Sequence, residues 1–109
     1  MPGKRIPDEI KNQVEARIVG SNREVIQDPN VSYVARYKGT FLYLDRSELG
    51  RAGPICRPEY TGTIDGWKFA IFKYSDEEYD AGEWMFPGSQ HVDGTVEGAM
   101  RAGMAAYPF

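Results

Sequence analysis

The segment FPGSQHVDGTVEGAM, residues 86–100, carries the residue types of a hydrolytic site. Ser89, His91 and Asp93 offer a nucleophile, a base and a carboxylate, and His91 is the only histidine of the chain. A working triad places the serine and the carboxylate at opposite nitrogens of the imidazole, which three residues of one short loop rarely achieve. No Gly-x-Ser-x-Gly turn presents Ser89. The pattern therefore favours a turn around His91 and a helix that is capped by Asp93 or Thr95.

Other reactive groups are few. Backbone N–H groups near Gly94 could bind an anion at the helix entrance, although the sequence has no cation between Lys73 and Arg101. Cys56 is the only cysteine, and its place in a strand-like run predicts a buried, inert thiol rather than a partner for His91. One cysteine and one histidine do not complete a usual zinc ligand set. We therefore expect no catalytic residue, metal or cofactor, and an enzyme centred on His91 is the least favoured alternative.

Aromatic and basic side chains are interleaved along the strand-like part of the chain, residues 31–74. On one face of a sheet, such side chains can stack nucleic-acid bases, as RNA-binding sheets do. Cross-strand aromatic pairs flanked by the stems of Arg and Lys give the same pattern, and this interpretation is favoured because strands are rich in aromatic residues. The candidate residues for binding a ligand or a partner are Tyr43, Arg57, Tyr60, Trp67, Tyr74, Trp84 and His91.

Periodicity and turn signals predict the elements that position these side chains. Apolar residues at helical spacing indicate one helix over residues 7–27, which starts at Pro7 and crosses a weak point at Gly-Ser-Asn, residues 20–22. A second long helix is predicted over residues 95–107. A capping-box pattern at Ser75 predicts a one-turn helix. Four strands are predicted, over residues 31–37, 40–46, 54–62 and 67–74.

The predicted fold is α+β: a four-stranded, mainly antiparallel meander with an N-terminal and a C-terminal helix, in the order α-β-β-β-β-α. Short connections of the kind seen here join antiparallel neighbours. We expect one domain over residues 1–109, with residues 1–5 as a flexible tail. One sheet face should pack on a helix, and the other should need cover from a partner or ligand. The last strand is apolar on both sides, with Trp67, Phe69 and Ile71 on one and Ala70, Phe72 and Tyr74 on the other.

Composition limits the classes of protein to which the chain can belong. It has 109 residues, of which 41% are hydrophobic, and a net charge of −3. The negative charge argues against a general nucleic-acid binder, which needs clustered cations. No apolar run is long enough to span a bilayer, and the polar start MPGKRIPDEIKNQ lacks a secretory pattern. Together with the single cysteine, these features predict a reduced, cytoplasmic protein.

Two stretches resemble known families. PGSQHVDGTVEGAMRAGMAAY is similar to the C-terminal part of HicB-type antitoxin domains, where a proline-glycine segment leads into Gly-Asp-Thr-x-Glu-Glu-Ala and a helix. Residues matching this pattern are Asp93, Gly94, Thr95, Glu97 and Ala99, with the Gly-Asp order inverted and a glycine for the second acidic residue. The layout of PICRPEY and GWKFAIFKY between two helices resembles small prokaryotic domains of unknown function, and this second resemblance implies no activity.

The sequence therefore favours a small, non-catalytic, cytoplasmic binding or interaction domain. The uncovered sheet face and the terminal Tyr-Pro-Phe are candidate contact surfaces for a protein partner or a second copy. The alternative is a nucleic-acid-binding module that uses the Tyr/Arg-rich sheet face, although the net charge disfavours it. An apolar cavity lined by Trp67, Phe72 and Trp84 would instead indicate a small-ligand binder.

Overall fold

The structure is a computed structural model that describes residues 5–82 and 85–108, so Trp84 and most of the predicted tail lie outside the described residues. Helix α1 (Asp8–Ser21) begins directly after Pro7, as predicted. The chain continues as a π-helical segment over Asn22–Ile26 and ends at Gln27, whose φ of 56° lies in the left-handed region. The predicted extent of the helix is therefore confirmed. Its backbone changes from α-helical to π-helical at the Gly-Ser-Asn stretch, residues 20–22.

Five strands form one antiparallel sheet in the order β1-β2-β3-β4-β5. They are β1 (Val31–Lys38), β2 (Phe41–Glu48), β3 (Arg51–Cys56), β4 (Ile71–Lys73) and β5 (Glu78–Asp80). The α+β class is confirmed, but the prediction of four strands is wrong. Strand β5 takes the place of the one-turn helix predicted at Ser75, because Phe72 and Tyr79 pair across β4 and β5. Tertiary pairing here overrides a local capping pattern.

The bounds of β3 and β4 also differ from the prediction. Leu49 and Gly50 form a tight turn with φ of 54° and 83°. Such a turn matches the twist of a hairpin, so β3 begins directly after it, where a loop was predicted. Pro58 lacks the N–H that a ladder needs, and β3 ends before it. Beyond this point one bridge, Glu59↔Lys68, joins the two segments, and β4 is correspondingly short.

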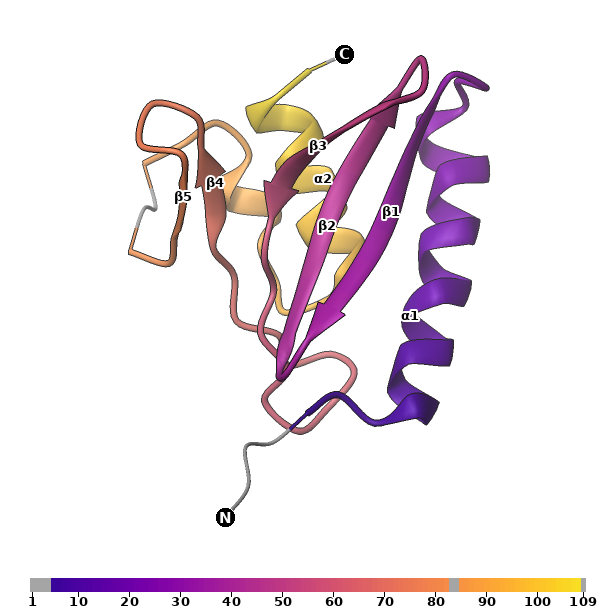
Figure 1. Cartoon of the computed structure of the whole chain (residues 1–109), viewed down its shortest axis with the longest axis vertical. Coiled ribbons are helices and arrows are strands. Elements are labelled where there is room, and N and C mark those ends of the chain that lie inside the picture. The colour runs from indigo at the N-terminus through magenta and orange to yellow at the C-terminus, as the bar shows by residue number, and fades with distance from the viewer. Residues whose placement is uncertain (1–4, 83–84, 109) are drawn as a thin grey trace.

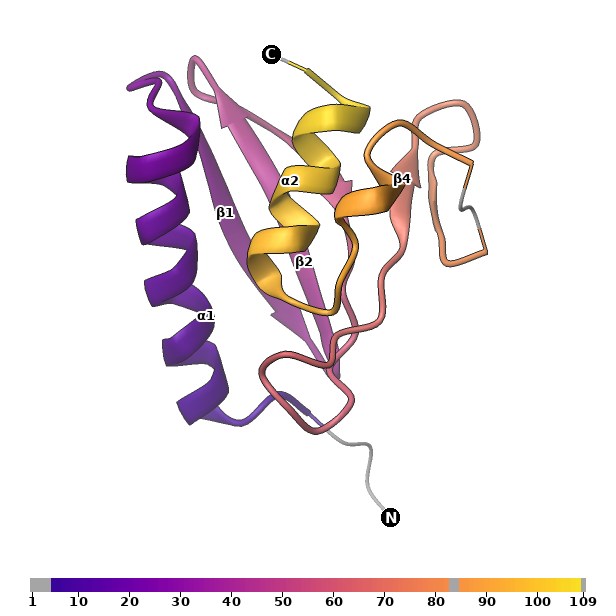
Figure 2. The same ribbon diagram turned by 180° about the vertical axis from the view of Figure 1, so that it is seen from behind.

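Both helices lie on one side of the sheet (Figure 1), and α2 (Val96–Ala106) crosses in front of it when seen from behind (Figure 2). Helix α1 lies beside β1. The helices and the covered face share a core of almost fully buried side chains, among them Val14, Ile18, Tyr33, Leu42, Leu44, Ile55 and Met100. Among the described helices, none has the length and apolar character to cross a membrane.

Helix α2 approaches the sheet closely at one glycine. A Cβ on Gly103 would lie 2.4 Å from a methyl group of Ile55 and 2.6 Å from the hydroxyl of Tyr33. That hydroxyl donates a buried hydrogen bond of 3.1 Å to the carbonyl of Met100. The absence of a side chain at Gly103 thus permits close packing of α2 on the sheet.

Strand alternation separates two faces of the sheet. Trp67, Phe69 and Ile71 are buried beneath the helices, as predicted for one side of their segment. Phe72 lies on the opposite face, paired with Tyr79. No helix covers this second face in either view, and we call it the open face (side chains of Val34, Arg36, Phe41, Tyr43, Arg57, Phe72 and Tyr79).

Candidate functional site

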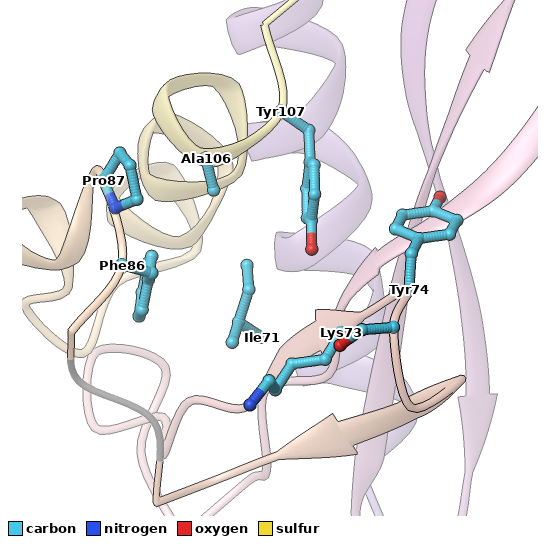
Figure 3. Close-up of a pocket in the computed structure, with 8 residues that line it drawn as sticks. Ile71, Lys73, Tyr74, Phe86, Pro87, Ala106 and Tyr107 are labelled. Atoms are coloured by element: carbon cyan, nitrogen blue, oxygen red, sulfur yellow. The ribbon is translucent and has the colours of Figure 1, made fainter.

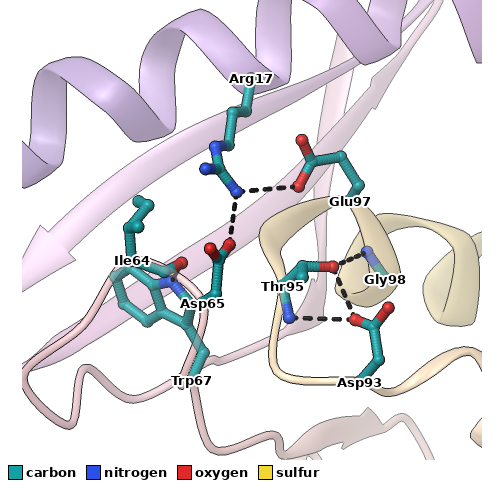
Figure 4. Close-up of polar contacts among 8 residues, drawn as sticks. All are labelled: Arg17, Ile64, Asp65, Trp67, Asp93, Thr95, Glu97 and Gly98. Carbon is teal, nitrogen blue, oxygen red and sulfur yellow. Dashed lines mark hydrogen bonds and ion pairs between the residues drawn. The ribbon is translucent and has the colours of Figure 1, made fainter.

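The start of α2 is a cap rather than a reactive cluster (Figure 4). The hydroxyl of Thr95 accepts a 2.9 Å bond from the N–H of Gly98, and the Asp93 carboxylate accepts bonds of 3.0 Å and 2.6 Å from the N–H and hydroxyl of Thr95. The bond from the Thr95 hydroxyl is the main reason that the pKa of Asp93 lies below its usual value. The predicted capping role of these residues is confirmed.

Arg17 supplies a cation near this entrance that the local sequence lacks. Its guanidinium lies 2.7 Å from the carboxylate of Asp65 and 3.4 Å from that of Glu97 (Figure 4). It therefore joins α1, the loop before Trp67 and the first turn of α2. Sequence reasoning missed it because Arg17 lies 80 positions before Glu97. The two carboxylates engage this cation, so it serves the fold.

Ser89 and His91 lie on a short 3-10 turn, and Cys56 lies elsewhere, fully buried in the core. Burial raises the pKa of the Cys56 thiol, which keeps it protonated and a poor nucleophile. Within the described part of the chain, no hydrogen bond joins the side chains of Ser89, His91 and Asp93. None of these side chains lines any of four cavities found among the described residues.

A continuous chain of ring contacts crosses the open face and continues to the end of α2, and we call it the aromatic arc (Phe41, Tyr43, Tyr79, Phe72, Tyr74 and Tyr107). Successive ring centroids along it lie 6.4, 5.4, 5.0, 4.8 and 5.3 Å apart. Most of these pairs meet edge to face, the geometry that aromatic quadrupoles favour. The arc begins on β2, crosses the open face to β5 and β4, and ends at Tyr107 beyond α2.

Two arginines are held against the arc. The guanidinium of Arg57 lies 4.2 Å from the ring centroid of Phe41 and 5.2 Å from that of Tyr79. Its Nε is buried and makes no hydrogen bond to any described residue. Arg36 lies 4.9 Å above Tyr43 and makes two hydrogen bonds to Asp45, of 2.6 Å and 3.2 Å. Both guanidinium groups are therefore fixed by rings or a carboxylate, which limits their conformational freedom.

The charge of the open face is opposite in sign to that of the chain. Cross-strand pairing places Lys38 opposite Phe41, Phe41 opposite Glu59, and Glu59 opposite Lys68, so these side chains share one face. With Arg36, Arg57 and Asp45, the described charged residues that are paired or stacked there are four cations and two carboxylates, a net charge of +2. The chain as a whole carries −3. The open face is thus locally basic within an acidic protein.

The far end of the arc separates two cavities. One, of about 360 Å³, lies between β4 and the end of α2, with Ile71, Phe86 and Tyr107 around it (Figure 3). The other, of about 400 Å³, is lined by the ends of β2 and β3. Tyr74 and Tyr107 line both cavities. We call the second one the Arg46 cavity after its buried arginine.

The structure brings only some of the predicted candidates together. Tyr43, Arg57 and Tyr74 lie on or against the arc. Tyr60 packs on the buried Trp67, with ring centroids 5.3 Å apart, and both belong to the core region rather than to the open face. Trp67 and Phe72, predicted to line one apolar cavity with Trp84, lie on opposite faces of the sheet, and Trp84 lies outside the described residues.

Four members of the arc were not among the candidate binding residues: Phe41, Phe72, Tyr79 and Tyr107. Phe72 was expected only as the wall of a possible cavity, and Tyr107 only as part of the terminal Tyr-Pro-Phe contact surface. Strand alternation from Tyr43 would have found Phe41. Tyr79 was hidden because its segment was assigned to a helical turn.

No family model, curated protein or solved structure matches this chain. The resemblance of the α2 entrance to HicB-type antitoxin domains therefore stays a prediction.

Proposed function

We propose that this protein is a non-catalytic binding domain whose open face contacts an acidic surface of a protein partner. The observation that carries the proposal is the aromatic arc with two fixed arginines on a face that no helix covers. Tyrosine and arginine are enriched among the residues that dominate protein interfaces. Rings and guanidinium groups that are already held in place lose little conformational entropy on binding.

The charges on the open face support an acidic partner. Its net charge of +2 would attract a negative surface and repel a second copy of itself, so face-to-face self-association is disfavoured. The carboxylates of Asp45 and Glu59 lie among the cations, which suits a protein surface of mixed charge better than a phosphate backbone. The rings also meet edge to face, and Arg57 covers Phe41, which leaves few free ring faces for stacking bases.

We further propose that the domain works in the reducing cytoplasm. Its single cysteine, Cys56, is buried in the core, where it packs as an apolar residue.

The open face offers a matched pair of positions for testing the proposal. Val34 is 42% exposed on the open face, beside Asp45, and Val19 is 53% exposed on α1. A photo-crosslinking amino acid at each position, in cells that contain the chain naturally, should capture an acidic protein from position 34 only. Excess wild-type protein should compete for it, and a Tyr43→Ala, Arg57→Gln variant should compete poorly.

Three outcomes of this experiment contradict the proposal. One is equal capture from positions 34 and 19, and another is equal competition by the variant. The third is crosslinking of nucleic acid from position 34, which would favour the nucleic-acid-binding alternative. A titration of the purified protein with single-stranded RNA at low salt checks that last outcome independently.

A further inference from the structure

The Arg46 cavity follows from strand alternation and from one glycine. Arg46 and Glu48 continue the covered face of β2 beyond Leu44, and Arg51 pairs with Glu48 across the hairpin. Gly53 stands opposite Arg46 in the register, and a Cβ at position 53 would lie 3.2 Å from the hydroxyl of Tyr74, so a side chain there would meet the ring that lines the cavity. The resulting cavity of about 400 Å³ falls within the roughly 300–1,000 Å³ range of small-ligand sites.

Among the described residues that line the cavity, positively charged side chains outnumber negatively charged ones. The side chain of Arg46 is only 3% exposed, and its Nε donates a 3.0 Å bond to the carboxylate of Glu48. Arg51 is exposed at the same cavity. Two guanidinium groups thus face one carboxylate, which is itself 43% exposed. A buried guanidinium binds planar anions in a fixed fork geometry, and a second cation at the rim increases the attraction.

The remaining walls are apolar and aromatic. Tyr74 and Tyr107 meet edge to face, with centroids 5.3 Å apart, and Ile55 lies at the same cavity. The Tyr74 hydroxyl donates a 2.7 Å bond to the carbonyl of Pro54, and the Tyr107 hydroxyl donates to the carbonyl of Phe72. Both hydroxyls are therefore engaged by the protein, and the rings offer flat apolar surface to a ligand.

From this lining we infer that the Arg46 cavity binds a small carboxylate with a ring-shaped apolar body. The carboxylate would lie against Arg46 and Arg51, and the ring against Tyr74 and Tyr107. A bare anion would use the cations and leave the apolar walls unfilled. The cations of this site lie off the open face, because Arg46 points toward the helix-covered side of the sheet, and the site shares only Tyr74 and Tyr107 with the end of the aromatic arc.

A titration with phenylacetate, followed by the amide resonances of the labelled protein, tests the inference. Saturable shifts are expected at Ala52 and Gly53, which line the cavity, and none at Tyr43 on the open face. Phenylacetamide has the same shape without the charge and should produce no comparable shifts. Arg51→Gln should weaken phenylacetate binding roughly tenfold, since hydrogen bonds to charged groups are strong.

The control is Lys38→Gln, which removes the same charge from an exposed position on the open-face side. It should bind phenylacetate like the wild type. Arg51 is chosen over Arg46 because an exposed side chain can be replaced without disturbing the core. The inference is overturned if Ala52 and Gly53 do not shift, if phenylacetamide binds equally well, or if inorganic phosphate binds as tightly as phenylacetate. None of these outcomes affects the proposal for the open face.

Discussion

Both faces of the sheet carry aromatic side chains, but their surroundings differ. On the covered face, Tyr33 is 1% exposed and its ring is locked beneath α2 by a bond to Met100. On the open face, Tyr43 and Tyr79 remain partly accessible and pack against arginines. The comparison shows that ring content alone does not distinguish a core from a contact surface. Helix cover and neighbouring charge make the distinction.

Adjacent residues of β2 give the sharpest comparison of the two faces. Leu44 is fully buried on the covered face, and Tyr43 points to the open face. Leu44→Ala should lower the free energy of unfolding by about 2–5 kcal/mol, because it leaves a cavity in the core. Tyr43→Ala should cost only about 1 kcal/mol, since it removes ring contacts near solvent. Urea denaturation measures the free energy of unfolding of both variants. Equal losses of stability would contradict the distinction between the two faces.

Two glycines in the helices should respond to alanine with opposite signs. Gly103→Ala places a methyl group against Ile55 and Tyr33, which should cost about 1–3 kcal/mol and outweigh the gain in helix propensity. Gly20, in α1, has open space at its Cβ position. Gly20→Ala should therefore stabilise the protein by up to about 1 kcal/mol. Thermal unfolding of both variants checks this, and a destabilised Gly20→Ala would contradict the packing described for α1.

The cap of α2 supports the covered face from its end. Thr95→Ala removes the hydroxyl that accepts the Gly98 N–H and should cost about 1 kcal/mol. Thr95→Ser keeps a hydroxyl and should restore most of the loss. Chemical denaturation of the two variants decides the point. A serine variant as unstable as the alanine variant would show that the methyl group of Thr95, rather than its hydroxyl, matters.

Asp93 should give the smallest effect, visible as a pH dependence. Its pKa is lowered in the folded protein, mainly by the hydroxyl of Thr95. Its charge therefore stabilises the fold above the unfolded pKa of about 3.9, and this contribution is lost as the pH falls through the lower, folded pKa. The difference in unfolding free energy between wild type and Asp93→Asn should shrink from pH 7 to pH 3. A difference that stays constant from pH 7 to pH 3 would show that the negative charge of Asp93 does not stabilise the fold.

The sequence predicted the features that depend on local signals. Periodicity located both long helices and the first two strands, and the cap at Thr95 was visible in residue types alone. What it could not predict depends on pairing between distant segments. Strand β5 exists because Tyr79 pairs with Phe72, and this pairing competes with a helical cap pattern at Ser75.

The candidate site shows the same division. Tyr43 and Arg57 were identified from residue type, because aromatic and basic side chains were interleaved. Only the three-dimensional structure shows that these residues belong to one chain of contacts with Tyr79 and Tyr107. The Arg46 cavity was not predicted, since it depends on Gly53 facing Arg46 across the β2–β3 register.

The most direct test measures how tightly the partner captured through position 34 binds variants of this protein. Two of the variants change the open face, and one changes the helix-covered side. The account predicts that Tyr43→Ala and Arg57→Gln each weaken this affinity roughly tenfold or more, as central interface residues do. Lys11→Gln removes a cation that lies on the other side, above Tyr37, and should leave the affinity unchanged. Calorimetric titration gives all three values. Unchanged affinity in the Tyr43 and Arg57 variants would contradict the claim that the open face is the binding surface.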